Sequence, residues 1–262
     1  MQSIPKLWLG TLYLSGDLAK DVIRSALDMG YTHIDTAQVY ENEEDIGEAL
    51  LGKDRDSFWL TTKIDFRDYG SLYPSFLASL QKLQMEYVDL LLLHRPTNLP
   101  EHERALDVMM QLQDEGKVRN IGVSNFTVVQ LQHAWKYTGG RIYTNQIEYH
   151  PCLSQDTIKA FADEQGIVIT AYSPLGHGNL LNNQTLQMIA DKHGASVAQI
   201  CIAWLLQQGC VVIPKASSVG RLKENFDAQT LELDEEDFAM IASLPKHHRY
   251  IDPPFAPEWD KS

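Results

Sequence analysis

The sequence predicts an α/β fold, a (β/α)8 TIM barrel, on three observations. Short apolar and β-branched runs alternate with amphipathic helical patterns along all 262 residues. Eight such runs occur, and the segments between them are long enough for crossover connections between parallel strands. No G-x-G-x-x-G follows an early run, although an open sheet that binds a dinucleotide would normally carry one. A barrel needs roughly 250 residues, so we expect a single barrel domain over residues 1–262.

The expected strands share apolar or β-branched composition and end before polar or glycine residues. They span residues 32–35, 58–63, 88–94, 120–124, 142–148, 167–172, 211–214 and 228–231. Residues 4–14 precede the first of them and are apolar, with Gly10 in the middle. We expect this segment to form an N-terminal β-hairpin that closes the bottom of the barrel.

Amphipathic helices are expected between the strands, with polar residues at their starts and glycines at their ends. One runs from a cap at Asp17 to Gly30, with an apolar face. A second runs from Asn42 to Gly52, and another from Ser154 to Gly166. The same strand–helix unit therefore recurs along the chain.

The charge and composition of the chain argue against some classes of binding partner. The formal net charge of −13 argues against nucleic acid or an anionic membrane, because phosphate binding needs a basic field over the surface. No apolar run approaches the roughly 20 residues that span a bilayer, and residues 1–16 lack the pattern of a secretory signal. We therefore expect a cytoplasmic protein that acts on a small molecule, without a membrane or nucleic-acid partner.

Cysteine and histidine usage predicts neither disulfides nor a metal site. Cys152, Cys201 and Cys210 are odd in number and are not at the spacing of metal ligands. His247 and His248 are adjacent but lie in a polar C-terminal stretch, and the other histidines are scattered along the chain. We expect three reduced, packed thiols and no metal.

Polar residues end most of the expected strands, where the reactive groups of a barrel lie. Asp35, Lys63 and His94 end three consecutive strands, and Tyr40 on the next loop can reach the same place. A cation beside a tyrosine favours phenolate, so we expect Lys63 to lower the pKa of Tyr40 from about 10 toward the working range. Tyr40 would then be a usable general acid, and His94 could orient a carbonyl or share the proton. Each of these four residues, taken alone, is compatible with a structural role. Their convergence at one end of the barrel favours a catalytic role.

The chain resembles the aldo-keto reductases from about Ile4 to Asp260. The resemblance rests on six motifs in order: Gly30-Tyr-Thr-His-Ile-Asp-Thr-Ala37 with Tyr40 and Asn42-Glu43; Leu91-Leu-Leu-His94 with Pro96; Ile121-Gly-Val-Ser-Asn-Phe126; Asn145-Gln-Ile-Glu148; Ala171-Tyr-Ser-Pro-Leu-Gly176; and Ile213-Pro-Lys215 with Arg221 and Asn225. The short loops and compact tail are similar to the bacterial 2,5-diketogluconate and methylglyoxal reductase branch. Barrels of this kind often act as monomers, which we expect here.

The resemblance implies a catalytic tetrad of Asp35, Tyr40, Lys63 and His94. It also implies an NADPH cofactor extended across the barrel mouth. The residues implied along it, from nicotinamide to adenine, are Ser124, Asn125, Gln146, Tyr172, Ser173, Leu175, Gly176, Lys215, Arg221, Glu224 and Asn225.

The implied roles make chemical sense. Ser124, Asn125 and Gln146 would hold the carboxamide of the nicotinamide, whose donors and acceptors match theirs. Tyr172 would stack on the ring.

The remaining contacts would lie along the phosphates and the adenine. Ser173, Leu175 and Gly176 would follow the pyrophosphate, where glycine permits close backbone approach. Lys215 and Arg221 would meet the 2′-phosphate, and two cations there favour NADPH over NADH. Glu224 and Asn225 would lie near the adenine.

Three residues depart from the family's pattern. Ala216 stands where many relatives have a serine that contacts the phosphate, which weakens the basis for NADPH preference. Arg95 and Asp65 stand where tryptophan is common, so the pocket is expected to be more polar and to hold aryl aldehydes less well. Phe255 and Trp259 of the tail are expected to pack against the barrel as hydrophobic anchors.

The sequence therefore predicts NADPH-dependent reduction of small aldehydes and ketones, of the methylglyoxal or diketo sugar acid type, with Tyr40 as general acid. One alternative is an aldolase in which Lys63 forms a Schiff base. It leaves Tyr172 and the residues from Lys215 to Asn225 unexplained. Another alternative is a barrel that binds NADPH as a sensor without turnover, against which the complete tetrad argues.

Overall fold

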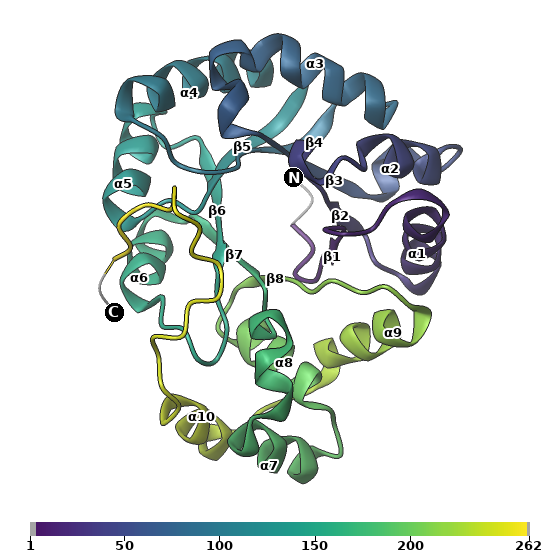
Figure 1. Cartoon of the computed structure of the whole chain (residues 1–262), viewed down its shortest axis with the longest axis vertical. Coiled ribbons are helices and arrows are strands. Elements are labelled where there is room, and N and C mark those ends of the chain that lie inside the picture. The colour runs from purple at the N-terminus through teal and green to yellow at the C-terminus, as the bar shows by residue number, and fades with distance from the viewer. Residues whose placement is uncertain (1–3, 261–262) are drawn as a thin grey trace.

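The computed structural model describes residues 4–260, and the predicted barrel is confirmed. Its eight parallel strands pair in chain order: β1 (Leu9–Gly10), β2 (His33–Asp35), β3 (Trp59–Ile64), β4 (Val88–Leu93), β5 (Val118–Ser124), β6 (Ile142–Glu148), β7 (Val168–Tyr172) and β8 (Val211–Ile213). Parallel bridges from Leu7 to Val212 and from Gly10 to Lys215 join the first strand to the last. The helices form a ring outside the strands (Figure 1).

Two of the strand predictions were wrong. Residues 4–14 do not fold as a hairpin, because Leu9 and Gly10 pair in parallel with β2 and the Trp8 amide donates to the Val212 carbonyl at 2.9 Å. The segment is the first strand of the barrel. Residues 228–231 are not the eighth strand; Ala228–Thr230 form a single 3-10 turn, η5.

The ten α-helices of the described chain are α1 (Gly16–Met29), α2 (Glu43–Leu50), α3 (Leu72–Leu83), α4 (Leu99–Asp114), α5 (Val128–Tyr137), α6 (Asp156–Gln165), α7 (Gln184–His193), α8 (Val197–Gln207), α9 (Val219–Asp227) and α10 (Glu235–Ala242). Short 3-10 helices η1 (Gln38–Tyr40) and η3 (Phe66–Ser71) follow β2 and β3. Both lie on the loops that lead from the carboxyl ends of strands, where a barrel places its active site.

Helix ends agree better with the sequence than helix starts. Gly30 ends α1 with a left-handed φ of 105°, and its amide donates to carbonyls of the last turn. Asp17 lies in the first turn of α1 rather than at its cap, which is Ser15. Asn42 does occupy the cap position of α2, but its side chain donates to the Thr11 and Leu14 carbonyls instead. Asn42 therefore ties the loop after β1 to the start of α2.

Side chains fill the inside of the barrel. A buried cluster separate from the main core comprises Trp8, Leu90, Leu92, Val211 and Ile213. Trp8 also stacks on His33, with ring centroids 3.5 Å apart. The barrel is therefore a packed core rather than a pore.

The cysteine prediction is confirmed, since Cys152, Cys201 and Cys210 are free and buried. Within residues 4–260, no helix has the length and apolar character needed to cross a membrane.

Candidate active site

A buried ion pair lies at the carboxyl ends of β2 and β3. The Lys63 Nζ lies 2.6 Å from Asp35 Oδ1, and the two side chains are 0% and 4% exposed. Nζ also donates to the Thr36 carbonyl at 2.8 Å. Parallel pairing of β2 with β3 brings the two strand ends together, as the sequence predicts.

Tyr40 and His94 complete the cluster. Tyr40 ends η1, so the turn after β2 carries its ring back over the barrel, where Lys63 Nζ lies 5.0 Å from the ring centroid. His94 directly follows β4, and its ring meets that of Tyr40 edge to face at 5.9 Å between centroids. Both side chains are half-buried. The structure therefore places all four predicted tetrad residues side by side.

The ionisation of these groups follows from burial and from one another's charge. Burial alone would lower the pKa of Lys63, but the charge of Asp35 and hydrogen bonds with Asp35 and Tyr40 outweigh it and raise that pKa, so Lys63 stays positive. Burial lowers the pKa of His94 well below its ordinary value, and the positive charges of Lys63 and Arg95 lower it further. His94 is therefore neutral at physiological pH.

Lys63 acts on the pKa of Tyr40 in the expected direction, but the expected net lowering of that pKa was wrong for the protein alone. Burial raises the pKa of Tyr40, and the charge of Lys63 opposes this without reversing it. Desolvation of a phenolate depends on packing around η1, which the sequence pattern does not report. Tyr40 is thus held protonated, the state that a proton donor requires.

The ends of β5, β6 and β7 carry a linked set of hydroxyl and amide groups. The Ser124 hydroxyl donates to the Gln146 carbonyl at 2.8 Å, and Gln146 Nε2 donates to Asp35 Oδ2 at 2.8 Å. Asn125, at a φ of 62°, donates to the His94 carbonyl and accepts a hydrogen bond of 2.7 Å from the Tyr172 hydroxyl. These predicted nicotinamide contacts are therefore connected to the tetrad.

The loop after β7 holds the three residues expected along a pyrophosphate. Ser173 and Gly176 have positive φ values of 49° and 54°, and Leu175 lies between them. A Cβ on Gly176 would come within 2.7 Å of the Tyr250 ring, so glycine is required here by the C-terminal segment as well as by its φ.

The residues expected at the 2′-phosphate and adenine lie on and before α9. Lys215 and Arg221 are exposed, and neither forms an ion pair within residues 4–260. Glu224 is half-buried and Asn225 is buried. Ala216, the first departure from the family's pattern, is fully buried and offers no side-chain donor.

Asp65 and Arg95, the other two departures from the family's pattern, make different contacts at the mouth of the barrel. Asp65 is buried and accepts hydrogen bonds from the backbone amide and the guanidinium of Arg67 at the start of η3. The negative charge of Asp65 is thereby neutralised by the guanidinium of Arg67. Arg95 instead lies beneath the tail, with its guanidinium carbon 5.2 Å from the Phe255 ring centroid.

The tail residues are not plain hydrophobic anchors. Phe255 is 54% exposed and packs on Phe66 as well as on Arg95, so it forms part of the rim. Trp259 donates its indole N–H to Asp252 and lies under Arg249, whose guanidinium carbon is 3.8 Å from the ring centroid.

Glu148, at the end of β6, is a structural residue of the site that the sequence reasoning left without a role. Its buried carboxylate accepts the backbone N–H groups of Tyr250 and Ile251 at 2.8 and 2.9 Å, and pairs with His150. It therefore fixes the start of the tail against the barrel. No local sequence signal joins residues about 100 positions apart, so only the fold could find this contact.

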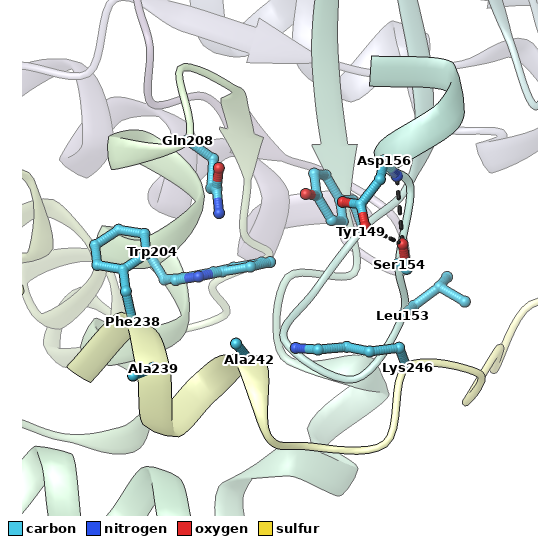
Figure 2. A pocket seen from close by; sticks show the side chains of 10 residues that line it. All are labelled: Tyr149, Leu153, Ser154, Asp156, Trp204, Gln208, Phe238, Ala239, Ala242 and Lys246. Atoms are coloured by element: carbon cyan, nitrogen blue, oxygen red, sulfur yellow. Dashed lines mark hydrogen bonds between the residues drawn. The ribbon is translucent and has the colours of Figure 1, made fainter. Parts of the chain in front are cut away.

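A separate cavity of about 410 Å³ lies between α8, α10 and the segment after β6 (Figure 2). Trp204, Phe238 and Lys246 are among its lining residues. The Lys246 ammonium donates to the Pro151 and Ile241 carbonyls, which braces this part of the chain. None of the four tetrad residues lines the cavity.

Comparison with known proteins agrees with this geometry. The model of the Aldo/keto reductase family matches residues 6–246. The methylglyoxal reductase DkgB of Escherichia coli O157:H7 is 40% identical over 266 residues, covering 98% of this chain and 100% of that protein. The glyoxal reductase of Bacillus subtilis is 38% identical and covers 90% of this chain and 86% of that protein.

Solved structures give the same result. The aldo-keto reductase MGS-M4 from a Medee basin deep-sea metagenome library superposes with a TM-score of 0.93 at 32% identity, covering 98% of this chain and 97% of that chain. An aldo/keto reductase from Brucella melitensis superposes with a TM-score of 0.87 at 41% identity, covering 91% and 93%. The resemblance found in the sequence is thus confirmed, and this chain belongs to the aldo/keto reductase family.

Proposed function

We propose that this reductase is NADPH-dependent and converts small aldehydes and ketones to alcohols, with Tyr40 as the general acid. The observation that carries the proposal is the arrangement of Tyr40 between a charged, buried Lys63 and a neutral His94. A carbonyl oxygen that gains negative charge needs a proton donor and a nearby positive charge, and these residues supply both.

The residues present fit the cofactor. Lys215 and Arg221 are exposed cations that form no ion pair with any described residue, beside the N-terminus of α9, which together suit a phosphate monoester. Ser124, Asn125 and Gln146 offer hydroxyl and amide groups for the carboxamide, and Tyr172 offers an aromatic face. When bound, NADPH supplies the hydride that is added to the carbonyl carbon.

Each tetrad residue has a distinct task in this proposal. The Tyr40 hydroxyl donates its proton to the carbonyl oxygen, and the Lys63 ammonium stabilises the phenolate that remains. Asp35 keeps Lys63 charged and holds it in position. The neutral His94 orients the carbonyl through a hydrogen bond from its ring N–H.

The proposed substrates are small and polar. The relatives are named for reduction of methylglyoxal and glyoxal, and the sequence resembles the branch that reduces diketo sugar acids. Arg95 and Asp65 replace aromatic walls at the mouth, which favours polar carbonyl compounds over aryl aldehydes.

The test is the oxidation of NADPH in the presence of methylglyoxal, with NADH and the Tyr40→Phe variant in parallel. A Tyr40→Phe rate reduced by about 10²- to 10⁴-fold, with NADPH binding retained, supports the acid assignment. A normal rate in this variant would refute it. Binding of NADPH by the wild type without turnover of any carbonyl would favour the sensor alternative.

A further inference from the structure

Arg95 is anchored at the barrel mouth directly after His94. The buried Tyr69 hydroxyl donates to the Arg95 carbonyl at 2.7 Å, and the Arg95 amide lies 3.3 Å from the same oxygen. Two contacts to one side chain fix the backbone at this position. The Arg95 side chain therefore leaves a defined point on the rim, next to a residue of the tetrad.

The guanidinium of Arg95 has no polar partner in the described part of the chain. It forms no ion pair or side-chain hydrogen bond there, and its Nη1 is buried and unbonded. Phe255 covers a face of the group, but a guanidinium donates from its edges, so this stacking leaves the donors free. Asp65, the acidic residue two positions after Lys63, is already matched by Arg67.

A buried donor without a partner costs free energy, so each such group needs a physical explanation. Arg95 Nη1 is one of seven such side-chain atoms in the described residues, and among them it belongs to the residue directly after His94. Arg95 also acts on the reacting groups, because its charge lowers the pKa of both Tyr40 and His94. The guanidinium is therefore close enough to the site to meet a molecule that is bound there.

We propose that Arg95 binds a carboxylate of the substrate, so that the enzyme prefers small oxo acids to neutral carbonyl compounds of the same size. The inference rests on the proposed reductase function and adds the residue that would select acidic substrates over neutral ones. A guanidinium and a carboxylate match in shape and can form two parallel hydrogen bonds. The carbonyl would then lie at Tyr40 while the acid group is held a few atoms away at the rim.

Arg249 provides a matched control within the same molecule. Its Nη1 is also buried and without a hydrogen-bond partner, and its guanidinium lies over Trp259. It belongs to the tail rather than to the loop after β4, and it is not adjacent to a tetrad residue. A general effect of removing a partnerless cation would occur at both positions, whereas substrate recognition is assigned to Arg95.

The experiment compares 4-oxobutanoate with butanal, which have the same chain length and differ by the carboxylate. With NADPH, the wild type is expected to favour 4-oxobutanoate in kcat/KM by about 10- to 100-fold, the range of a charge-assisted hydrogen bond. Arg95→Met is expected to bring the ratio close to one, chiefly through a higher KM for the acid. Arg249→Met is expected to keep the wild-type ratio.

The ratio of the two substrates cancels any general loss of activity in a variant. Arg95→Lys keeps the charge without the planar pair of donors and is expected to give an intermediate ratio. Competitive inhibition of the wild type by succinate, measured against butanal, adds a test that needs no variant, and succinamide is expected to inhibit far less.

The outcomes separate this inference from the proposed function. If the wild type reduces none of methylglyoxal, butanal and 4-oxobutanoate, the reductase proposal itself fails. If it reduces butanal and 4-oxobutanoate with equal kcat/KM, the reductase stands and the carboxylate preference is overturned. A preference that disappears in Arg249→Met but persists in Arg95→Met would overturn the assignment to Arg95.

Discussion

Lys63 and Asp35 form an ion pair with Nζ and Oδ1 2.6 Å apart, in a place where neither side chain is more than 4% exposed. Two buried charges are stable only as a pair, because removal of one leaves the other buried without a counter-charge. The pair also receives Gln146 Nε2 on the second carboxylate oxygen. The positive charge beside Tyr40 is thus fixed in position before a substrate arrives.

Breaking the pair from one side should destabilise the protein. We expect Asp35→Asn or Lys63→Met to lower the free energy of unfolding by about 3–5 kcal/mol, because each leaves a buried partner unmatched. The double variant Asp35→Asn/Lys63→Met should lose much less than the sum of the two single variants. Urea unfolding of all three measures this, and additive losses would show that the two charges are not coupled.

The pH profile of reduction should lack a histidine ionisation. Because the pKa of His94 lies well below its ordinary value of about 6.5, we expect kcat/KM to be level from roughly pH 6 to 9. A donor must be protonated, and burial raises the pKa of Tyr40, so activity is lost only as the pH rises through that higher value. His94→Gln should lower the rate and keep the shape of the profile. A limb near neutral pH that disappears in this variant would contradict the neutral state of His94.

The choice of cofactor should depend on two exposed cations. We expect Lys215→Met and Arg221→Met each to raise the KM for NADPH by about tenfold and to leave the KM for NADH nearly unchanged, since NADH lacks the 2′-phosphate. Lys223, which is exposed on α9 and paired with Asp227, offers a control. An equal effect of Lys223→Met would show that net charge, rather than a phosphate site, sets the preference.

Two helical glycines should respond in opposite ways to alanine. A Cβ on Gly47 in α2 would lie 2.6 Å from the Leu83 and Lys82 carbonyl oxygens, so α2 and α3 would have to separate. We expect Gly47→Ala to cost about 1–3 kcal/mol in thermal or urea unfolding. Gly220 in α9 has nothing within 4 Å, and Gly220→Ala should be neutral or stabilising by up to about 1 kcal/mol. Equal effects would refute the role of close helix packing.

Glu148 should hold the tail only while it is ionised. Burial alone would raise its pKa, but hydrogen bonds from His150, Tyr250 and Ile251 outweigh this and lower it. The stability it contributes is therefore present above its ordinary pKa of about 4.3 and is lost as the pH falls through the lower value in the folded protein.

We expect Glu148→Gln to cost about 1–3 kcal/mol at neutral pH and to speed hydrogen exchange at the amides of Tyr250 and Ile251. The exposed Glu164 gives the control variant Glu164→Gln. A difference from wild type that persists at acid pH would show that the charge of Glu148 is not responsible.

The sequence predicted most of the barrel because buried parallel strands contain continuous apolar runs, as in residues 90–93 of β4. Leu9–Gly10 has two residues and shows no alternation, so its place between β2 and β8 depends on partners distant in the chain. The convergence of Asp35, Tyr40, Lys63 and His94 was predictable because these residues lie at the ends of strands or shortly after them. The pKa of Tyr40, the free donors of Arg95 and the clamp at Glu148 were not, because burial and long-range pairing arise only from the packed structure.

The pairing of Leu7 with Val212 also concerns how the molecule is made. During synthesis, the first strand leaves the ribosome about 200 residues before its partner. Until then the nascent chain is an open sheet with two unpaired edges, and such edges invite association with other chains. The edges can therefore close only near the end of translation, when emergence of the last strand removes both of them at once.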